Sequence, residues 1–259
     1  MSEQRVRYLN GPGNGIGWCD YTWNPVTGCL RGCRFGSNGT PCYAETMAKR
    51  FGGSFQPAFH PERLGAPERL VARGSEPPPG PPVNGGERLW RIFVGSMTDM
   101  MHEAVPAEWI EQVIQVCRDC PEHVFIWLTK DAVRYAEFRW PGNCWLGRTV
   151  TRQSDAVIPG GLSRLFDSNA RHFFVSVEPM LGPVDLVSWI LPMSSYGRPC
   201  RHVEWVIIGG MTGAGAVQPE EEWVDALERD CGRYGVPVFE KENLRCRRGE
   251  KRRTEFPEG

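Results

Sequence analysis

The sequence has no long hydrophobic run and no excess of charge of either sign. None of its 259 residues lies in a stretch approaching the roughly 18 apolar residues of a membrane-spanning helix, and residues 1–10 contain no apolar signal region. Its 30 Lys and Arg residues nearly balance 31 Asp and Glu residues, so no overall field attracts nucleic acid or an anionic membrane. We therefore expect a cytoplasmic protein without membrane contact, in which any contact with nucleic acid comes from a local patch.

Short apolar segments alternate with segments of helical periodicity, and no internal repeat is present. The composition, with 41% hydrophobic and 24% charged residues, is that of a folded protein with a substantial core. Several apolar segments are rich in β-branched and aromatic residues on both faces, which is typical of a buried parallel sheet. The predicted strands are Arg91–Val94, Val124–Leu128, Cys144–Val150, His172–Val177, Val203–Ile208 and Val236–Phe239, and the predicted helices are Pro106–Cys120 and Glu220–Tyr234. This order predicts a single α/β domain over residues 1–259, built as a partial or complete parallel barrel.

Two segments interrupt this alternation. Residues 74–88 contain five prolines, which neither continue a helix nor donate to a sheet, so we expect an exposed loop there. The tail, residues 241–259, is locally basic, with Arg245, Arg247, Arg248, Lys251, Arg252 and Arg253 among several glutamates. We interpret the tail as a solvated terminus, with a nucleic-acid contact as the alternative.

Four of the ten cysteines lie close together near the N-terminus, at Cys19, Cys29, Cys33 and Cys42. In a reducing compartment, thiols serve metals, redox chemistry or the core rather than disulfides. The last three cysteines lie on a glycine-rich loop that leads into a predicted helix beginning at Tyr43. Three cysteines placed in this way can bind three irons of a [4Fe-4S] cluster and leave the fourth iron open for a ligand.

Two other interpretations of these cysteines stay open. A structural zinc ion usually has paired knuckles of closely spaced ligands, whereas the gaps here are nine, three and eight residues. Buried cysteines without a metal are common, although a loop rich in Gly, Asn, Ser and Thr offers little core to pack into. Cys117 and Cys120, at positions i and i+3 of a predicted helix, are interpreted as ordinary helix residues. The pattern favours a metal over packing, and iron–sulfur over zinc.

The order of seven motifs resembles that of the three-Cys-motif proteins, a family of phage and bacterial proteins. The motifs are TWNPVTGC, CYAETMAKR, FVGSMTDMMHEAVP, WLTK, CWLGRTV, FFVSVEPMLGPVDL and VEWVIIGGMTG. The resemblance extends from about Gly17 to Phe239. That family is similar to the radical S-adenosylmethionine (radical SAM) enzymes, nearest the spore photoproduct lyase branch. The resemblance therefore implies an α/β barrel of the radical SAM type, located in the cytoplasm of a bacterial or phage-infected cell.

The resemblance also implies which residues hold the cluster. Its ligands would be Cys29, Cys33 and Cys42, followed by Tyr43 at the position of an aromatic residue near the cofactor adenine. The superfamily usually has gaps of three and then two residues, whereas this chain has gaps of three and eight residues. Cys19 is a further cysteine that can substitute for one ligand.

The rest of the cofactor site follows from barrel logic, because functional groups lie at the carboxyl ends of parallel strands. Ser96, Thr98 and Asp99 follow the first predicted strand, at the position where radical SAM enzymes receive the methionine ammonium of the cofactor, and a carboxylate suits a cation. Gly209 and Gly210 follow a later strand and offer backbone space for a ligand. A turn or salt bridge at a strand end is the alternative for each position.

The activity implied by the resemblance is reductive cleavage of S-adenosyl-L-methionine at a [4Fe-4S] cluster, giving a 5′-deoxyadenosyl radical that modifies or repairs a nucleic-acid base or nucleotide. Lys130 and Glu178, each after a predicted strand, are the predicted catalytic residues. Trp18, Tyr21 and Trp23 beside the cysteines can stack a base, with core packing as the alternative. The expected partners are the nucleic-acid or nucleotide substrate, a reductant such as flavodoxin or ferredoxin, and a protein of the three-Cys-motif system.

Two further functions are compatible with the sequence. One is a nucleic-acid-binding protein without catalysis, stabilised by zinc or by an iron–sulfur cluster. The other is a barrel enzyme whose cysteines are merely structural.

Overall fold

An eight-stranded sheet forms the centre of the computed structural model, which describes residues 6–11, 13, 15–35, 38–72, 90–158, 161–191, 201–213, 215–247 and 252–257. The strands, in sheet order, are β1 (Leu9–Asn10), β2 (Tyr21–Trp23), β7 (Arg91–Val94), β8 (Val124–Thr129), β9 (Cys144–Thr149), β10 (His172–Val177), β11 (Trp205–Ile208) and β12 (Val238–Glu240). All neighbours from β2 to β12 are parallel, and β1 pairs with β2 in the antiparallel direction. The α/β fold with parallel strands is therefore confirmed.

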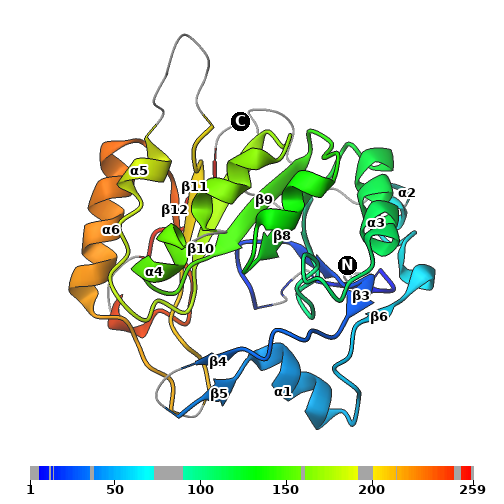
Figure 1. The fold of residues 1–259 in the computed structure, drawn as a ribbon, viewed down its shortest axis with the longest axis horizontal. Coiled ribbons are helices and arrows are strands. Elements are labelled where there is room, and N and C mark those ends of the chain that lie inside the picture. The colour runs from blue at the N-terminus through cyan, green and yellow to red at the C-terminus, as the bar shows by residue number, and fades with distance from the viewer. Residues whose placement is uncertain are drawn as a thin grey trace, which may run out of the picture.

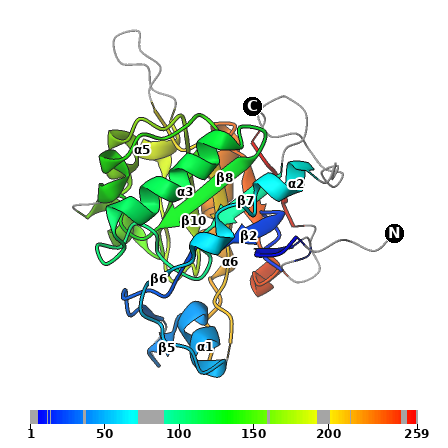
Figure 2. The same cartoon turned by 90° about the vertical axis from the view of Figure 1, so that its right-hand side faces the viewer.

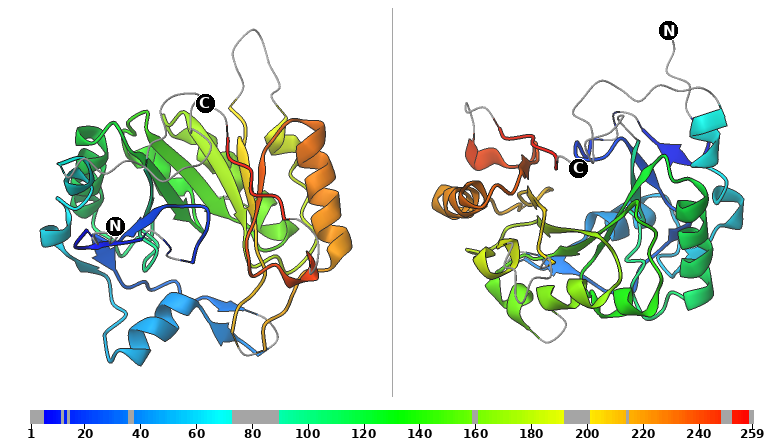
Figure 3. Two further views of the ribbon diagram at one scale, coloured as in Figure 1. Left: turned by 180° about the vertical axis from the view of Figure 1, so that it is seen from behind. Right: turned by 90° about the horizontal axis from the view of Figure 1, so that it is seen from above.

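The sheet is an open barrel. Its order begins at β1 and ends at β12, and among the described residues no ladder joins these two edges. Figure 3 shows the sheet curving around an interior, with helices outside it. The barrel expected from the sequence is thus partial, and the carboxyl ends of β7 to β12 form one rim because all six strands run in the same direction.

The two faces of the sheet pack into two separate apolar clusters. On β8, Val124 and Ile126 point into the inner cluster, whereas Phe125 and Trp127 between them belong to the outer one, as the alternation of a pleated strand requires. The inner cluster is aromatic, with Trp18, Trp145, Phe174, Trp205 and Phe239. Strands buried on both faces explain why the sequence segments are almost continuously apolar.

The helices cover the outer face and connect the strands. They are α1 (Tyr43–Arg50), α2 (Glu68–Ala72), α3 (Ala107–Asp119), α4 (Gln153–Val157), α5 (Val187–Ile190) and α6 (Glu221–Arg233), with short 3₁₀ turns at Pro61–Arg63, Val133–Glu137, Leu162–Asp167 and Arg245–Arg247. Helix α3 buries Ile110, Val113, Ile114 and Cys117, and α6 buries Val224, Leu227 and Cys231. Both helices lie outside the curved sheet, with α6 at the left and α3 at the right in Figure 1. Both match the predicted helices to within one residue at each end.

Two small two-stranded antiparallel sheets lie outside the main sheet. One pairs β3 (Val26–Thr27) with β6 (Ala58–Phe59), and the other is a hairpin that pairs β4 (Arg34–Phe35) with β5 (Thr40–Pro41). The β4–β5 hairpin and α1 form a lobe that projects from the body of the barrel (Figure 2). These two small sheets, β1 and β2 were not predicted from the sequence.

The structure decides some of the sequence predictions, whereas others concern residues outside its described part. Trp18, Tyr21 and Trp23 are buried, so core packing is the correct interpretation of all three. The predicted loop at 74–88, Cys200, and Arg248 and Lys251 of the basic tail lie outside the described residues. No helix in the described part of the chain combines the length and the apolar character needed to cross a membrane.

Candidate functional site

The β4–β5 hairpin brings Cys33 and Cys42 together. Arg34 pairs with Pro41 and Phe35 with Thr40, so the next positions outward in the register are Cys33 and Cys42. Residues facing each other across an antiparallel ladder have Cα atoms about 4.5–5.5 Å apart. The eight-residue gap in the sequence is therefore folded back on itself, and the two cysteines flank the base of the hairpin.

Cys29 is fixed on the same segment by close backbone packing. Its N–H donates to the Phe55 carbonyl oxygen at 2.9 Å. Gly28 before it has a φ of +84°, and a Cβ there would lie 2.1 Å from the carbonyl oxygen of Gln56. Glycine is required at position 28 because the backbone of residues 55–56 packs closely against it. This packing explains the glycine without contact with a bound group.

The three thiols are half-buried and affect one another electrostatically. Burial raises the pKa of the Cys33 thiol above its ordinary value, the Lys130 ammonium opposes this rise, and thiolates at Cys42 and Cys29 add to it. Burial also raises the pKa of Cys29, while the backbone N–H groups of Arg31 and Asp99 lower it. Cys29 and Cys33, whose thiols are harder to ionise than usual, are suited to a positively charged group that would stabilise their thiolates.

Hydrogen bonds from backbone amides reach two of the sulfur atoms. The N–H of Arg31 donates to Cys29 Sγ at 3.5 Å, and the N–H of Glu45 donates to Cys42 Sγ at 3.4 Å, which makes Cys42 the N-cap of α1. Amide–sulfur hydrogen bonds are a common feature of iron–sulfur sites, where they tune the cluster. Within the described residues, no three His, Cys, Asp or Glu side chains are arranged to enclose one metal ion. A four-iron cluster takes each thiolate at a different iron, so the donor set of three thiols fits it.

Lys130, predicted to be catalytic, lies beside the hairpin. Its Nζ lies 5.4 Å from the centre of the Phe35 ring, and its charge acts on Cys33 as described above. Lys130 directly follows β8, so the carboxyl end of this strand places a cation beside the lobe formed by the β4–β5 hairpin and α1. Functional groups are expected at this end of the strands in a parallel barrel.

The loop after β7 also faces the cysteine segment. The Thr98 hydroxyl donates to the Gly28 carbonyl oxygen at 2.5 Å, and the Gly28 N–H donates to the Met97 carbonyl oxygen at 3.1 Å. Ser96 exchanges hydrogen bonds with the side chain of Asn24, and its carbonyl oxygen accepts one from the Tyr43 hydroxyl at 3.2 Å. The predicted cofactor-binding residues of this loop are thus brought together with the cysteines, and each holds the segment that carries them.

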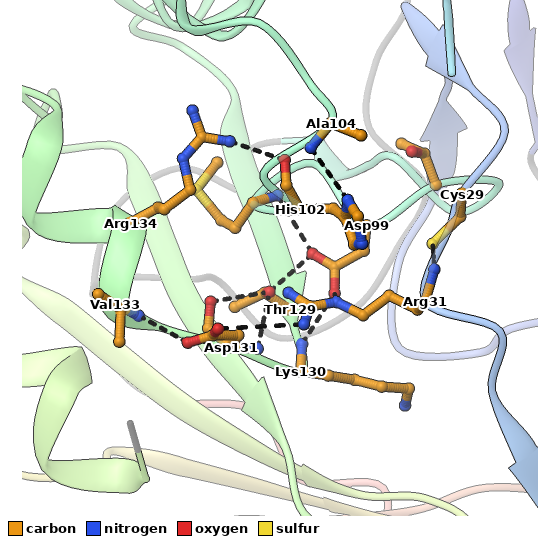
Figure 4. A network of polar contacts seen from close by, with 12 residues as sticks. Cys29, Arg31, Asp99, His102, Ala104, Thr129, Lys130, Asp131, Val133 and Arg134 are labelled. Carbon is orange, nitrogen blue, oxygen red and sulfur yellow. Dashed lines mark hydrogen bonds and ion pairs between the residues drawn. The ribbon is translucent and has the colours of Figure 1, made fainter. Parts of the chain in front are cut away.

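Asp99 is the centre of a polar network at this rim (Figure 4). Its Oδ2 accepts hydrogen bonds from Arg31 Nε at 2.9 Å and from the Lys130 N–H at 3.1 Å. Its Oδ1 accepts from the Thr129 hydroxyl at 2.7 Å and from the Met101 N–H at 3.1 Å. A carboxylate has about four acceptor sites, and these four donors occupy them. In this arrangement Asp99 therefore has no free acceptor site for the ammonium group of a cofactor, which was its expected role.

Tyr43 and Glu178 interact electrostatically at this rim. Tyr43 is 56% exposed, and its hydroxyl donates to the Ser96 carbonyl oxygen. Partial burial raises the pKa of the phenol, with smaller contributions from Cys42, Cys19 and Glu178. Glu178 Oε1 accepts hydrogen bonds from Lys241 Nζ at 2.6 Å and from Asn243 Nδ2 at 3.1 Å. Lys241 and Asn243 were missed from the sequence, although they follow β12 as Lys130 follows β8.

The space beside Gly209 and Gly210 is filled by protein. A Cβ at Gly209 would lie 3.0 Å from the Glu178 side chain, and one at Gly210 would lie 2.5 Å from Gln218 Oε1. The Asn243 side chain also bonds both the N–H and the carbonyl oxygen of Gly210. These glycines make room for neighbouring side chains, which corrects the expectation of open backbone space for a ligand.

The remaining cysteines of the described chain pack in the core or at its border. Cys19 is buried in the inner aromatic cluster, and Cys117, Cys120, Cys144 and Cys231 are buried in the outer one. The interpretation of Cys117 and Cys120 as ordinary helix residues agrees with this packing, with Cys120 just after the end of α3.

Comparisons with known proteins agree on the fold. No curated protein matches the sequence. A solved structure of a spore photoproduct lyase variant is similar with a TM-score of 0.56 and 9% identity, covering 92% of this chain and 80% of that one. A second variant of spore photoproduct lyase gives 0.52 and 11%, with the same coverage. At these identities the likeness is one of fold. Residues 13–255 match the family described as "Protein of unknown function (DUF5131)", and the chain belongs to this family.

Proposed function

We propose that the protein is a radical SAM enzyme that modifies or repairs a nucleic-acid base or nucleotide, with Cys29, Cys33 and Cys42 as ligands of a [4Fe-4S] cluster. The observation that carries the proposal is the β4–β5 hairpin, which places Cys33 and Cys42 side by side at the carboxyl rim of an open parallel barrel, on the segment that also holds Cys29. The fold shared with spore photoproduct lyase and the order of motifs resembling the three-Cys-motif proteins support it.

Bound at this rim, the cluster and S-adenosyl-L-methionine supply reductive carbon–sulfur cleavage, with a flavodoxin or ferredoxin as electron donor. The protein's own contribution is orientation and the exclusion of water. The Tyr43 hydroxyl ties the start of α1 to the loop after β7, and the inner aromatic cluster fills the interior of the barrel. A dry, fixed site suits a reaction through a reactive intermediate.

In this proposal Lys130 and Glu178 are the catalytic residues. Lys130 Nζ supplies a positive charge beside the cysteine lobe. Glu178 is held at the rim by Lys241 Nζ and Asn243 Nδ2, which both donate to its Oε1 and so orient the carboxylate. Ser96, Thr98 and Tyr43 form the wall between them, where the cofactor is proposed to lie.

The substrate class is proposed from the fold and from the name of the similar enzyme, which acts on a spore photoproduct. The chain as a whole is neutral, so a nucleic acid would be recognised by local cations. Lys130 provides such a cation beside the β4–β5 hairpin, and Arg34 and Lys49 provide two positive charges that share one carboxylate, Glu45.

The test is anaerobic reconstitution with iron and sulfide. We expect about four irons and four sulfides per chain, brown colour, and release of 5′-deoxyadenosine from S-adenosyl-L-methionine with a strong reductant. Cys29→Ala, Cys33→Ala and Cys42→Ala should each lose the cluster, because an open-iron site has no spare protein ligand. Cys246→Ala is the matched control, since this half-exposed cysteine lies in the 3₁₀ turn at Arg245–Arg247.

Two results would contradict the proposal. Equal iron retention in all four variants would remove the cysteine assignment. A colourless protein with one zinc ion per chain would instead favour the nucleic-acid-binding protein without catalysis.

A further inference from the structure

Asp99 and Arg31 form a partly buried ion pair between the barrel and the cysteine segment. Only 9% of the Asp99 side chain and 22% of the Arg31 side chain are exposed, and Arg31 Nε lies 2.9 Å from Asp99 Oδ2. Arg31 stands midway between Cys29 and Cys33, so the pair attaches the middle of the segment that carries both thiols.

The barrel side of this pair is rigid. Three of the four hydrogen bonds to Asp99 come from the barrel side: the Thr129 hydroxyl and the Lys130 N–H lie at the carboxyl end of β8, and the Met101 N–H lies in the loop after β7 that carries Asp99 itself. A carboxylate held by three donors from the barrel has one acceptor site left to offer, and Arg31 takes it. Because the site is fixed before Arg31 arrives, little side-chain entropy is lost on pairing.

The same segment is joined to the barrel at two neighbouring points. Thr98 donates to the Gly28 carbonyl oxygen, and Gly28 donates to the Met97 carbonyl oxygen. Among these contacts the Arg31–Asp99 pair is the one that involves opposite charges, and Arg31 lies between Cys29 and Cys33 in the sequence. The N–H of Arg31 also reaches Cys29 Sγ.

We propose that Asp99 is a positioning residue, which fixes the Cys29–Cys33 segment against the barrel rim through Arg31. The inference rests on the proposed function, which gives the Cys29–Cys33 segment its purpose of binding a cluster. The Arg31–Asp99 pair itself, called the clamp below, exists in the protein without a cluster. Its consequence is that two of the three thiols keep their separation in the absence of metal, so the site is formed before the cluster is inserted.

The experiment is hydrogen–deuterium exchange of the complete protein without metal, comparing Arg31→Gln, Asp99→Asn, the double variant and Arg31→Lys. We expect amides of residues 28–33 to exchange about tenfold faster or more in each of the first two variants, because a charge-assisted bond is lost. The double variant should be no faster than Arg31→Gln alone, since both changes break the Arg31–Asp99 pair and Arg31→Gln also removes the 4.0 Å contact between Arg31 and Asp131. Arg31→Lys should restore part of the protection, because it keeps the charge.

Matched controls separate this effect from general loosening. Arg164→Gln removes an Arg–Asp pair of the same 2.9 Å length, to Asp167 on the surface, and should leave residues 28–33 unchanged. Strand β10, residues 172–177, should exchange at the same rate in all variants. If Asp99→Asn does not fold, the exchange rates of Arg31→Gln test the proposal alone, because Arg31 is the more exposed partner of the pair.

Two results would overturn the positioning role. One is an unchanged exchange rate of residues 28–33 in Arg31→Gln, and the other is a double variant in which the effects of the two single variants add. Reconstitution with iron then gives a separate readout, in which Arg31→Gln should broaden the electron paramagnetic resonance spectrum of the reduced cluster while Arg164→Gln does not. A wild-type protein that binds no iron would refute the proposed function, but the exchange measurement without metal would still decide the clamp.

Discussion

Stability should fall as pH rises from about 5 to 7, because of a pair of buried carboxylates at the edge of the barrel. Glu228 on α6 and Glu240 on β12 each have a buried Oε1 that receives no hydrogen bond. Burial, and then the neighbouring Glu240, raise the pKa of Glu228 from 4.5 to about 7, although Arg247 acts in the opposite direction. Glu228 is therefore partly protonated at neutral pH.

The sign of the effect follows from where the proton binds more tightly. The folded protein holds the proton up to about pH 7, whereas the unfolded chain releases it near its ordinary pKa of 4.5. The stabilisation is complete below that lower value and is lost as pH rises towards the folded-state pKa. A shift of this size corresponds to at most about 3 kcal/mol of unfolding free energy.

Glu228→Gln isolates this contribution, because glutamine stays neutral at every pH. The groups that face Glu228 are Arg247, which also pairs with Asp225 and Glu221, together with Glu240 and Arg253. Urea unfolding from about pH 5 to 8 should show the variant close to wild type at the acid end and more stable than wild type at the alkaline end. Glu222→Gln, exposed on the same helix, is the control and should follow wild type throughout. A Glu228→Gln curve parallel to wild type, or lower at about pH 8, would refute the raised pKa of Glu228.

Three substitutions test the packing that supports the site, each measured by urea unfolding. Gly147→Ala should cost about 1–3 kcal/mol, because the new Cβ would lie 2.3 Å from the buried Phe174 ring; no loss would show that the ring moves freely. Asp20→Ala should cost about 3–5 kcal/mol by leaving Arg91 buried without its carboxylate, and adding Arg91→Met should recover part of the loss. Asn143→Ala should cost about 1–3 kcal/mol, since its amide nitrogen serves three carbonyl oxygens at the end of α3; a stability equal to wild type would contradict this.

The strands and long helices could be predicted because their cause is local. Residues 172–177 are mostly apolar on both faces, a pattern that favours a strand buried on both sides. They form β10 with the predicted bounds. The alternation of such segments with amphipathic helices then fixes parallel connections and a common rim. For this reason Lys130 and Glu178 were placed correctly on one rim from their positions after strands, although their roles stay a proposal.

The internal arrangement of the site could not be predicted, because it depends on partners distant in the sequence. Asp99 contacts Arg31 across 68 residues, and Thr98 contacts Gly28 across 70. Nothing in the local sequence shows whether a carboxylate after a strand faces a ligand or a loop of its own chain. The β4–β5 hairpin was missed because two-residue strands such as Arg34–Phe35 carry no periodic signal.

The hairpin between Cys33 and Cys42 has a consequence for the recognition of related sequences. In an antiparallel ladder, adding or removing one residue on each strand keeps the same two positions opposite each other at the base. The number of residues between these cysteines is then free to vary in steps of two while their distance in space stays constant. A search that demands a fixed spacing would overlook such chains, whereas one that asks for two cysteines bracketing a short hairpin before a helix would find them.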